Sequence, residues 1–230
     1  MTDVRVSDDA AKAAVAAAAW LEALVVDTLR SSNSCSIALS GGSSPAAMHT
    51  ALSRSQNIDW TRVMLFFGDE RCVPPDHPGS NYRMARETLI APARIPDGNV
   101  FRMEAEAQDR ERAALLYESL LPSALDVIVL GVGADGHTAS LFPDAEAVRE
   151  AARGVVVASG PEPYPARLTI TPIVISAARD LLVLAPGSNK AEAIRRALDP
   201  STDTRSTPAA LARRGTWFLD RPAAALIGLP

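Results

Sequence analysis

Short apolar runs alternate along this chain with segments of helical character, and most of the runs enter a turn marked by glycine or proline. The runs are CSIAL (35–39), RVMLFF (62–67), DVIVL (126–130), GVVVAS (154–159), DLLVLA (180–185) and TWFLD (216–220). Apolar strands that alternate with helices are typical of a parallel sheet covered on both faces. We therefore expect an α/β fold with a mainly parallel central sheet.

The segments between these runs predict helices. Residues 7–30 are rich in alanine and leucine, begin with capping candidates and carry apolar residues at helical spacing. Further helices are expected at 46–54, 80–91, 109–121, 172–178, 188–198 and 208–214, with a short closing helix after Asp220. The polar stretch 198–208 lies too near the end of the chain to separate domains, so residues 1–230 are predicted to form one domain.

Composition and charge argue against several classes of protein. The net charge is −4, and the 23 basic residues are spread along the chain, which argues against a nucleic-acid partner. The sequence has no secretory start and no apolar run of the ~18 residues that span a bilayer, so we expect a cytoplasmic protein without a membrane partner. Cys35 and Cys72 form no CxxC pair, which fits thiols in a reducing compartment and argues against a metal site.

The stretch LGVGADGH, 130–137, sets Asp135 and His137 in a glycine-rich turn directly after an expected strand. Open α/β sheets place their chemistry at the carboxyl ends of strands. Gly136 permits a positive φ between the two side chains, which would let them share one pocket. An imidazole held by a carboxylate accepts a proton from water near neutral pH, which is typical of a hydrolase. The alternative is that Asp135 caps the next segment and His137 is a structural residue.

Two further segments follow expected strands. SGGSSP, 40–45, offers backbone N–H groups of Ser40, Gly41, Gly42 and Ser43 and a helix N-terminus to an anion such as phosphate; the alternative is an ordinary turn with Ser44 as N-cap. GDER, 68–71, brings Asp69 and Arg71 to the same edge of the sheet, where Arg71 is suited to hold a carbonyl or hydroxyl oxygen; the alternative is a local ion pair.

Charged and imidazole side chains elsewhere supply additional candidates. Arg167 and Lys190 are placed to reach an anion held by the 40–45 turn, although each taken singly reads as a surface charge. His77, in the loop PPDHPGSN, is a secondary candidate because polar loops beside strand ends often carry function. His49 is expected at the surface or the edge of the core. The serine-hydrolase pattern GxSxG and the metal pattern HExxH are both absent from the sequence.

The order and spacing of SGGSSP, FFGDERCVPPDHPGSNYRMARETL, DVIVLGVGADGHTASLFP and RLTITPIVISAARDLLVLAPGSNKAEAIRRAL resemble the glucosamine-6-phosphate isomerase/6-phosphogluconolactonase family, and its lactonase members in particular. The resemblance implies a Rossmann-like three-layer sandwich of the sugar-phosphate isomerase/deaminase type. It also implies hydrolysis of 6-phospho-D-glucono-1,5-lactone in the oxidative pentose phosphate pathway, with a sugar phosphate as the partner and neither metal nor organic cofactor. For the assembly we expect a monomer, with a dimer as the alternative.

The resemblance assigns roles to the candidates. His137 matches the general base, Asp135 the carboxylate beside it and Arg71 the arginine near the substrate. The 40–43 turn, Arg167 and Lys190 match the phosphate site, and Asp69 matches an acidic position of undefined role. Sugar-phosphate deaminases carry a glutamate five residues after the histidine, where this chain has Phe142, which favours the lactonase. A deaminase or isomerase and a sugar-phosphate-binding module without catalysis remain the alternatives.

Overall fold

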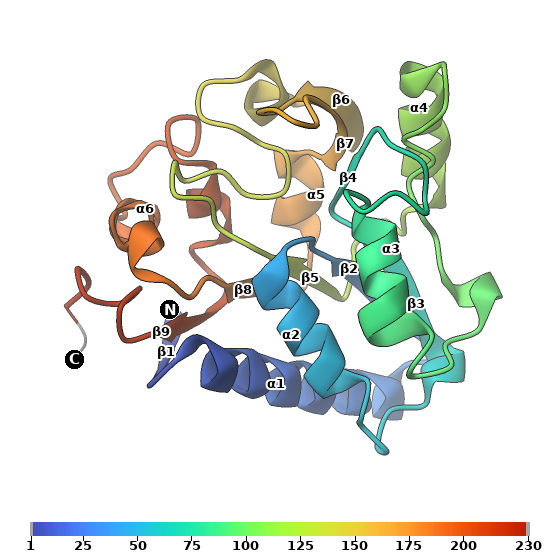
Figure 1. The fold of residues 1–230 in the computed structure, drawn as a ribbon, viewed down its shortest axis with the longest axis horizontal. Coiled ribbons are helices and arrows are strands. Elements are labelled where there is room, and N and C mark those ends of the chain that lie inside the picture. The colour runs from blue at the N-terminus through green and yellow to red at the C-terminus, as the bar shows by residue number, and fades with distance from the viewer. Residues whose placement is uncertain (1, 229–230) are drawn as a thin grey trace.

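The structure, a computed structural model, describes residues 2–228 and centres on a sheet of six strands (Figure 1). In spatial order these are β1 (Asp3–Ser7), β9 (Thr216–Asp220), β8 (Asp180–Leu184), β5 (Val127–Leu130), β2 (Cys35–Leu39) and β3 (Val63–Phe67). Every neighbouring pair is parallel, so the carboxyl ends of all six strands lie at one edge. The predicted α/β class with a mainly parallel central sheet is confirmed.

Helices cover both faces of this sheet, because alternate strand residues point to opposite sides. Ile37 and Leu39 belong to the core beneath the first two helices, whereas Ala38 between them belongs to the core on the other face. Figure 1 shows α1 and α2 lying together across one side of the strands. The helices are α1 (Ala10–Ser31), α2 (Ser43–Leu52), α3 (Asn81–Ala85), α4 (Arg110–Leu120), α5 (Pro172–Ala177) and α6 (Ala191–Leu198).

Single helical turns complete the connections. A π-helical turn, Arg86–Ile90, continues α3, so the helix predicted at 80–91 is present with Ser80 as its N-cap. The 3₁₀ turns are Trp60–Arg62, Asp97–Asn99, Glu146–Arg149, Ser188–Lys190 and Pro208–Ala212. Within residues 2–228 no helix has the length and apolar character that crossing a membrane requires.

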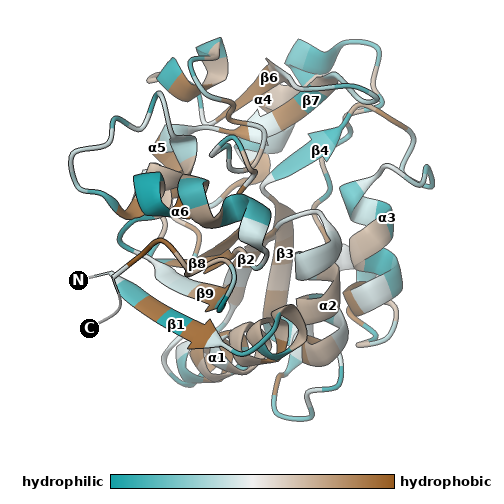
Figure 2. Ribbon diagram, turned by 60° about the vertical axis from the view of Figure 1, so that its left-hand side comes forward, coloured by the Kyte–Doolittle hydropathy of each residue, from teal (hydrophilic) through white to brown (hydrophobic). Residues whose placement is uncertain are grey.

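A second, antiparallel sheet of three strands adjoins the carboxyl edge of the first. Its order is β4 (Asp69–Arg71), β7 (Ala166–Ile170) and β6 (Val155–Ser159). Only Gly68 separates β3 from β4, and its N–H donates to Leu39 O at 2.8 Å. Figure 2 shows β4 as a hydrophilic strand beside the more hydrophobic β6 and β7.

The second sheet corrects two expectations. The run 154–159 lies mainly in a strand, β6, but of this antiparallel sheet and not of the parallel one, and within GDER residues 69–71 form a strand and not a turn. An apolar run has the same local pattern in either sheet, and pairing between segments far apart in sequence decides which sheet it joins.

The two ends of the chain also differ from expectation. Residues 3–7 form β1, and the first helix begins only at Ala10, because the Asp9 side chain caps it by accepting from Lys12 N at 2.8 Å. The segment after Asp220 forms turns and not a helix. Asp220 Oδ1 accepts from Ala223 N and Gly187 N, both at 2.9 Å, which ties this segment to the loop after β8.

Candidate active site

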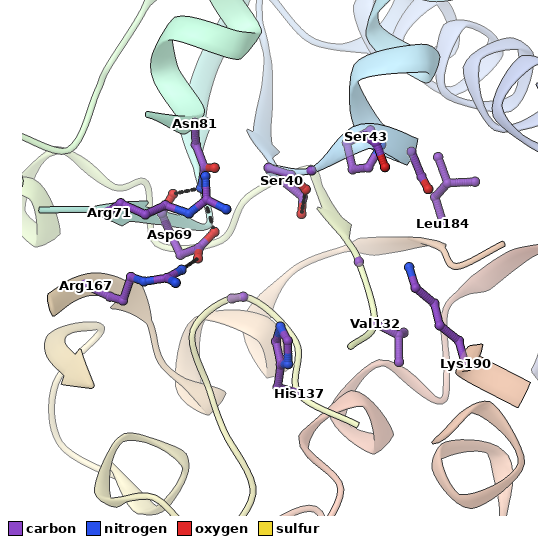
Figure 3. Close-up of a pocket in the computed structure, with 16 residues that line it drawn as sticks. Ser40, Ser43, Asp69, Arg71, Asn81, Val132, His137, Arg167, Leu184 and Lys190 are labelled. Carbon is purple, nitrogen blue, oxygen red and sulfur yellow. Dashed lines mark hydrogen bonds and ion pairs between the residues drawn. The ribbon is translucent and has the colours of Figure 1, made fainter. Parts of the chain in front are cut away.

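A cavity of about 240 Å³ opens where the carboxyl ends of β2, β5 and β8 meet β4 and β7 of the second sheet. Figure 3 shows Arg71 and Arg167 on one side of it, Lys190 on the other and His137 between them. The predicted residues that line the cavity are Ser40, Gly41, Gly42, Ser43, Asp69, Arg71, His137, Arg167 and Lys190. Segments spread from residue 40 to residue 190 therefore converge on one volume.

The turn after β2 brings backbone N–H groups to the cavity. Gly42, with φ +104°, is the N-cap of α2, and no side chain caps the helix start. The Ser44 N-cap of the alternative reading is therefore wrong. A Cβ at Gly41 would overlap the Asn81 side-chain amide, so only glycine permits this approach of the turn to α3. An uncapped helix N-terminus with small residues suits an anion.

The turn after β5 holds Asp135 and His137 together. Gly136 has φ +95°, and its N–H donates to Gly133 O at 3.0 Å, while Gly133 N donates to His137 O at 2.9 Å. In this tight turn the imidazole Nδ1 lies 2.6 Å from Asp135 Oδ1, and the same oxygen accepts from His137 N at 3.1 Å. Asp135 does not itself line the cavity but stands behind the imidazole.

The carboxylate determines which imidazole nitrogen is free. Partial burial works to raise the pKa of Asp135, but the hydrogen bonds and charge of His137 outweigh it and bring the pKa below its ordinary value of 3.8. An ionised carboxylate can only accept, so in the neutral form of the imidazole Nδ1 carries the hydrogen and Nε2 has the lone pair. The ring packs against Phe142 at 4.6 Å between centroids and lines the cavity. The pair can thus present a basic nitrogen to a bound molecule.

Asp69 is a buried carboxylate with both oxygens engaged. Asn81 Nδ2 donates to Oδ1 at 3.1 Å, and Ser140 Oγ donates to Oδ2 at 2.6 Å. Arg167 Nη1 lies 4.0 Å from Oδ2, a long ion pair between strands and not within a loop. Because each of its oxygens already accepts from a neighbouring side chain, Asp69 is suited to fixing Asn81 and Ser140 in place.

Three residues of this network were missed from the sequence. Asn81 lines the cavity, Ser140 holds Asp69, and buried Glu70 accepts four hydrogen bonds. The donors to Glu70 are Arg71 N, Ser80 Oγ, Asn81 N and Tyr82 N, at 2.7–2.9 Å. Burial is the largest influence on the Glu70 pKa and raises it, despite these bonds. The GDER segment and the Ser80–Asn81 pair at the start of α3 are the sequence signals for Glu70 and Asn81, whereas no pattern marks Ser140.

The cavity is positively charged. Burial lowers the pKa of Lys190 from its ordinary value of 10.5, with Asp220 opposing the shift, and Figure 3 shows its ammonium group directed toward the 40–43 turn. Burial also lowers the pKa of Arg167. Cationic groups that are partly stripped of water attract an anionic ligand strongly.

The other two histidines lie outside this cavity. His77 accepts from Gly79 N at 2.9 Å and packs against Tyr164. His49 is wholly buried in α2, not at the surface, and burial lowers its pKa to about 4. In the part of the chain that the structure describes, no group of three or more His, Cys, Asp or Glu residues is arranged to hold a metal ion.

Several proteins that are similar to this chain in sequence or structure are named 6-phosphogluconolactonase. The chain is 40% identical over 207 residues to a 6-phosphogluconolactonase of Mycobacterium tuberculosis, covering 82% of this chain and 83% of that protein. It is 38% identical over 233 residues to one of Streptomyces coelicolor, covering 92% and 89%. The solved 6-phosphogluconolactonase of Trypanosoma brucei superposes with a TM-score of 0.88 at 29% identity, covering 99% of both chains.

The fold extends to other sugar-phosphate enzymes. A monomeric glucosamine-6-phosphate deaminase superposes with a TM-score of 0.85 at 22% identity, over 97% of this chain and 99% of that one, which shows a shared fold only. The family model described as glucosamine-6-phosphate isomerases/6-phosphogluconolactonase matches residues 8–219. The chain therefore belongs to the glucosamine-6-phosphate isomerase/6-phosphogluconolactonase family.

Proposed function

We propose that this protein hydrolyses 6-phospho-D-glucono-1,5-lactone to 6-phospho-D-gluconate, with His137 as general base. The observation that carries the proposal is that His137 lines a cationic cavity while Asp135 Oδ1 holds its Nδ1 at 2.6 Å, which leaves Nε2 for the ligand. Relatives of 38–40% identity that are named 6-phosphogluconolactonase support this choice of substrate.

The phosphate dianion is assigned to the uncapped start of α2, with Lys190 and Arg167 as its charged partners. Each charge-assisted hydrogen bond of this kind contributes ~1.5–3 kcal/mol. Binding of the remote phosphate fixes the position of the lactone ring. This lowers the entropic cost of aligning the reacting carbonyl with the attacking water.

The chemical step needs one proton acceptor and one polarised carbonyl. His137 Nε2 takes a proton from the water whose oxygen attacks the lactone carbonyl carbon, while the Arg71 guanidinium faces the developing oxyanion. The ring C–O bond then breaks, and the imidazolium returns its proton to the departing ring oxygen. General-base catalysis of this type is worth a factor of ~10²–10⁴.

Phe142 favours hydrolysis over deamination. Its ring packs against His137 at a position where the deaminase pattern has a glutamate. Ring opening and amine release need that additional proton carrier, whereas lactone hydrolysis does not.

The test offers freshly made 6-phosphogluconolactone and follows acid release. We expect acceleration by the wild-type protein and a loss of kcat of ~10²-fold or more in His137→Ala, with the dissociation constant of 6-phosphogluconate little changed. Tight binding of 6-phosphogluconate without faster hydrolysis would identify a binding module. Ammonia release from glucosamine 6-phosphate would identify a deaminase, and either result refutes the lactonase.

A further inference from the structure

Two loops beside the cavity meet at an aromatic contact that the mechanism above does not use. His77 lies between β4 and α3, and Tyr164 lies between β6 and β7. Their rings are 5.4 Å apart between centroids and nearly perpendicular, at 83°. A Cβ at Gly79 would come within 2.7 Å of the Tyr164 ring, so the loops are closely packed here. Neither ring lines the cavity.

Each loop holds one of the two cavity arginines. Arg71 Nη1 donates to Gly79 O at 2.7 Å, and Gly79 N in turn donates to His77 Nδ1 at 2.9 Å. On the other side, Arg167 Nε donates to Tyr164 O at 2.6 Å. The contact between His77 and Tyr164 therefore joins the segment that orients one guanidinium to the segment that orients the other.

The two guanidinium groups need such support because they repel each other. Arg71 and Arg167 are direct partners in the antiparallel β4–β7 register, where like charges oppose pairing. The nearest carboxylate oxygen to Arg167, Asp69 Oδ2, is 4.0 Å away, and Arg71 Nε is buried without a hydrogen-bond partner in residues 2–228. The hydrogen bonds to the carbonyl oxygens of Gly79 and Tyr164 therefore fix the side chains of Arg71 and Arg167.

We propose that His77 and Tyr164 act as a positioning pair, which holds Arg167 beside the phosphate and Arg71 beside the lactone carbonyl of the bound ligand. The inference rests on the proposed function, because it assigns a sugar phosphate to this cavity. His77 then acts through Gly79 and takes no part in the reaction itself. Tyr164 affects ligand binding although it does not line the cavity.

The test is a double-mutant cycle on the full chain. His77→Ala, Tyr164→Ala and the double variant are compared for the dissociation constant of 6-phosphogluconate, by calorimetry, and for KM and kcat with the lactone. We expect each single variant to raise the dissociation constant of 6-phosphogluconate and KM about tenfold, the scale of one aromatic pair, because Arg167 is displaced, and to lower kcat as well, because Arg71 faces the developing oxyanion. The double variant should also lose about tenfold, because both changes break the same link.

Conservative variants separate positioning from general loosening of the fold. Tyr164→Phe keeps the ring and the backbone carbonyl and should restore wild-type binding. His77→Asn supplies an acceptor for Gly79 N without a ring, and His77→Phe supplies the ring without the acceptor, so each should restore part of the affinity. Thermal unfolding of every variant checks that it is folded, and Tyr164→Leu replaces Tyr164→Ala if the latter is not.

Two results would overturn the pair. One is a dissociation constant within twofold of wild type in both single variants, and the other is a loss of about a hundredfold in the double variant, which would mean independent loops. Failure of the proposed function looks different, since the wild-type protein itself would then not hydrolyse the lactone or bind 6-phosphogluconate. In that case the same cycle is run with inorganic phosphate, which probes the anion site that Arg167 lines.

Discussion

Alanine at Gly133 should separate the imidazole from its carboxylate without unfolding the protein. A Cβ at this position would fall 2.5 Å from Asp135 Oδ1 and would also overlap His137 Nδ1, two atoms that are themselves only 2.6 Å apart. Both obstructing groups are ends of rotatable side chains, and Gly133 is not among the residues with positive φ. The expected response is therefore that the two side chains turn away from the added methyl group while the backbone keeps its course.

The magnitude follows from what the imidazole contributes when it is correctly placed. Since general-base catalysis is worth a factor of ~10²–10⁴, we expect Gly133→Ala to lower kcat by about 10²-fold, with a smaller change in KM. Initial rates of acid release measure kcat, and urea unfolding measures stability. Gly131→Ala is the matched variant in the same turn, because its Cβ would lie 3.7 Å from Ser40 Oγ, an ordinary contact, and would leave the dyad in place; since Gly131 lines the cavity, its effect should appear in KM and not in kcat. A folded Gly133→Ala enzyme with kcat within about threefold of wild type would refute this account of the dyad.

Three further predictions concern binding and stability. Lys190→Ala should weaken binding of 6-phosphogluconate by about tenfold to a hundredfold, measured by calorimetry, because it removes a charged donor from the cavity. Tyr117→Phe should cost about 2 kcal/mol in urea unfolding, since the buried hydroxyl bonds both Phe67 N and Phe67 O, at 2.7 Å and 3.1 Å. Burial lowers the pKa of His49 from 6.5 to about 4, so between these pH values the unfolded chain binds a proton that the native protein does not. The contribution of His49 to the free energy of unfolding should therefore be constant above pH ~6.5 and should fall by about 3 kcal/mol as the pH drops to ~4. In His49→Leu and His49→Gln this part of the pH dependence of the unfolding free energy should be absent.

The parallel sheet could be predicted from sequence because burial on both faces produces unbroken apolar runs. Its five strands from β2 to β9 follow runs that were recognised as such. β1 gave a weaker signal, since it lies at the edge of the sheet, is mostly half-buried and contains Asp3 and Arg5. The second sheet could not be foreseen, because its strands pair across long stretches of chain, such as Asp69 with Thr169.

The site residues could be predicted where a turn follows a strand, because the parallel arrangement brings those turns to one edge. That rule found the turn at 40–43 and the pair of Asp135 and His137. It gave no access to Ser140, whose hydroxyl bonds Asp69 across 71 positions of sequence. It also placed His77 near the site without showing that the imidazole faces Tyr164 and not the cavity.

The outer side of β3 is closed to strand addition. β3 is the last strand of its sheet, yet Phe101 N donates to Leu65 O at 2.8 Å, and the Tyr117 hydroxyl occupies both main-chain groups of Phe67. An unpaired strand edge is a template on which another chain can add a strand and begin to aggregate. Here Phe101 N and the Tyr117 hydroxyl already occupy main-chain groups of β3. Two copies of the protein could therefore not extend the sheet through this edge without first breaking native hydrogen bonds.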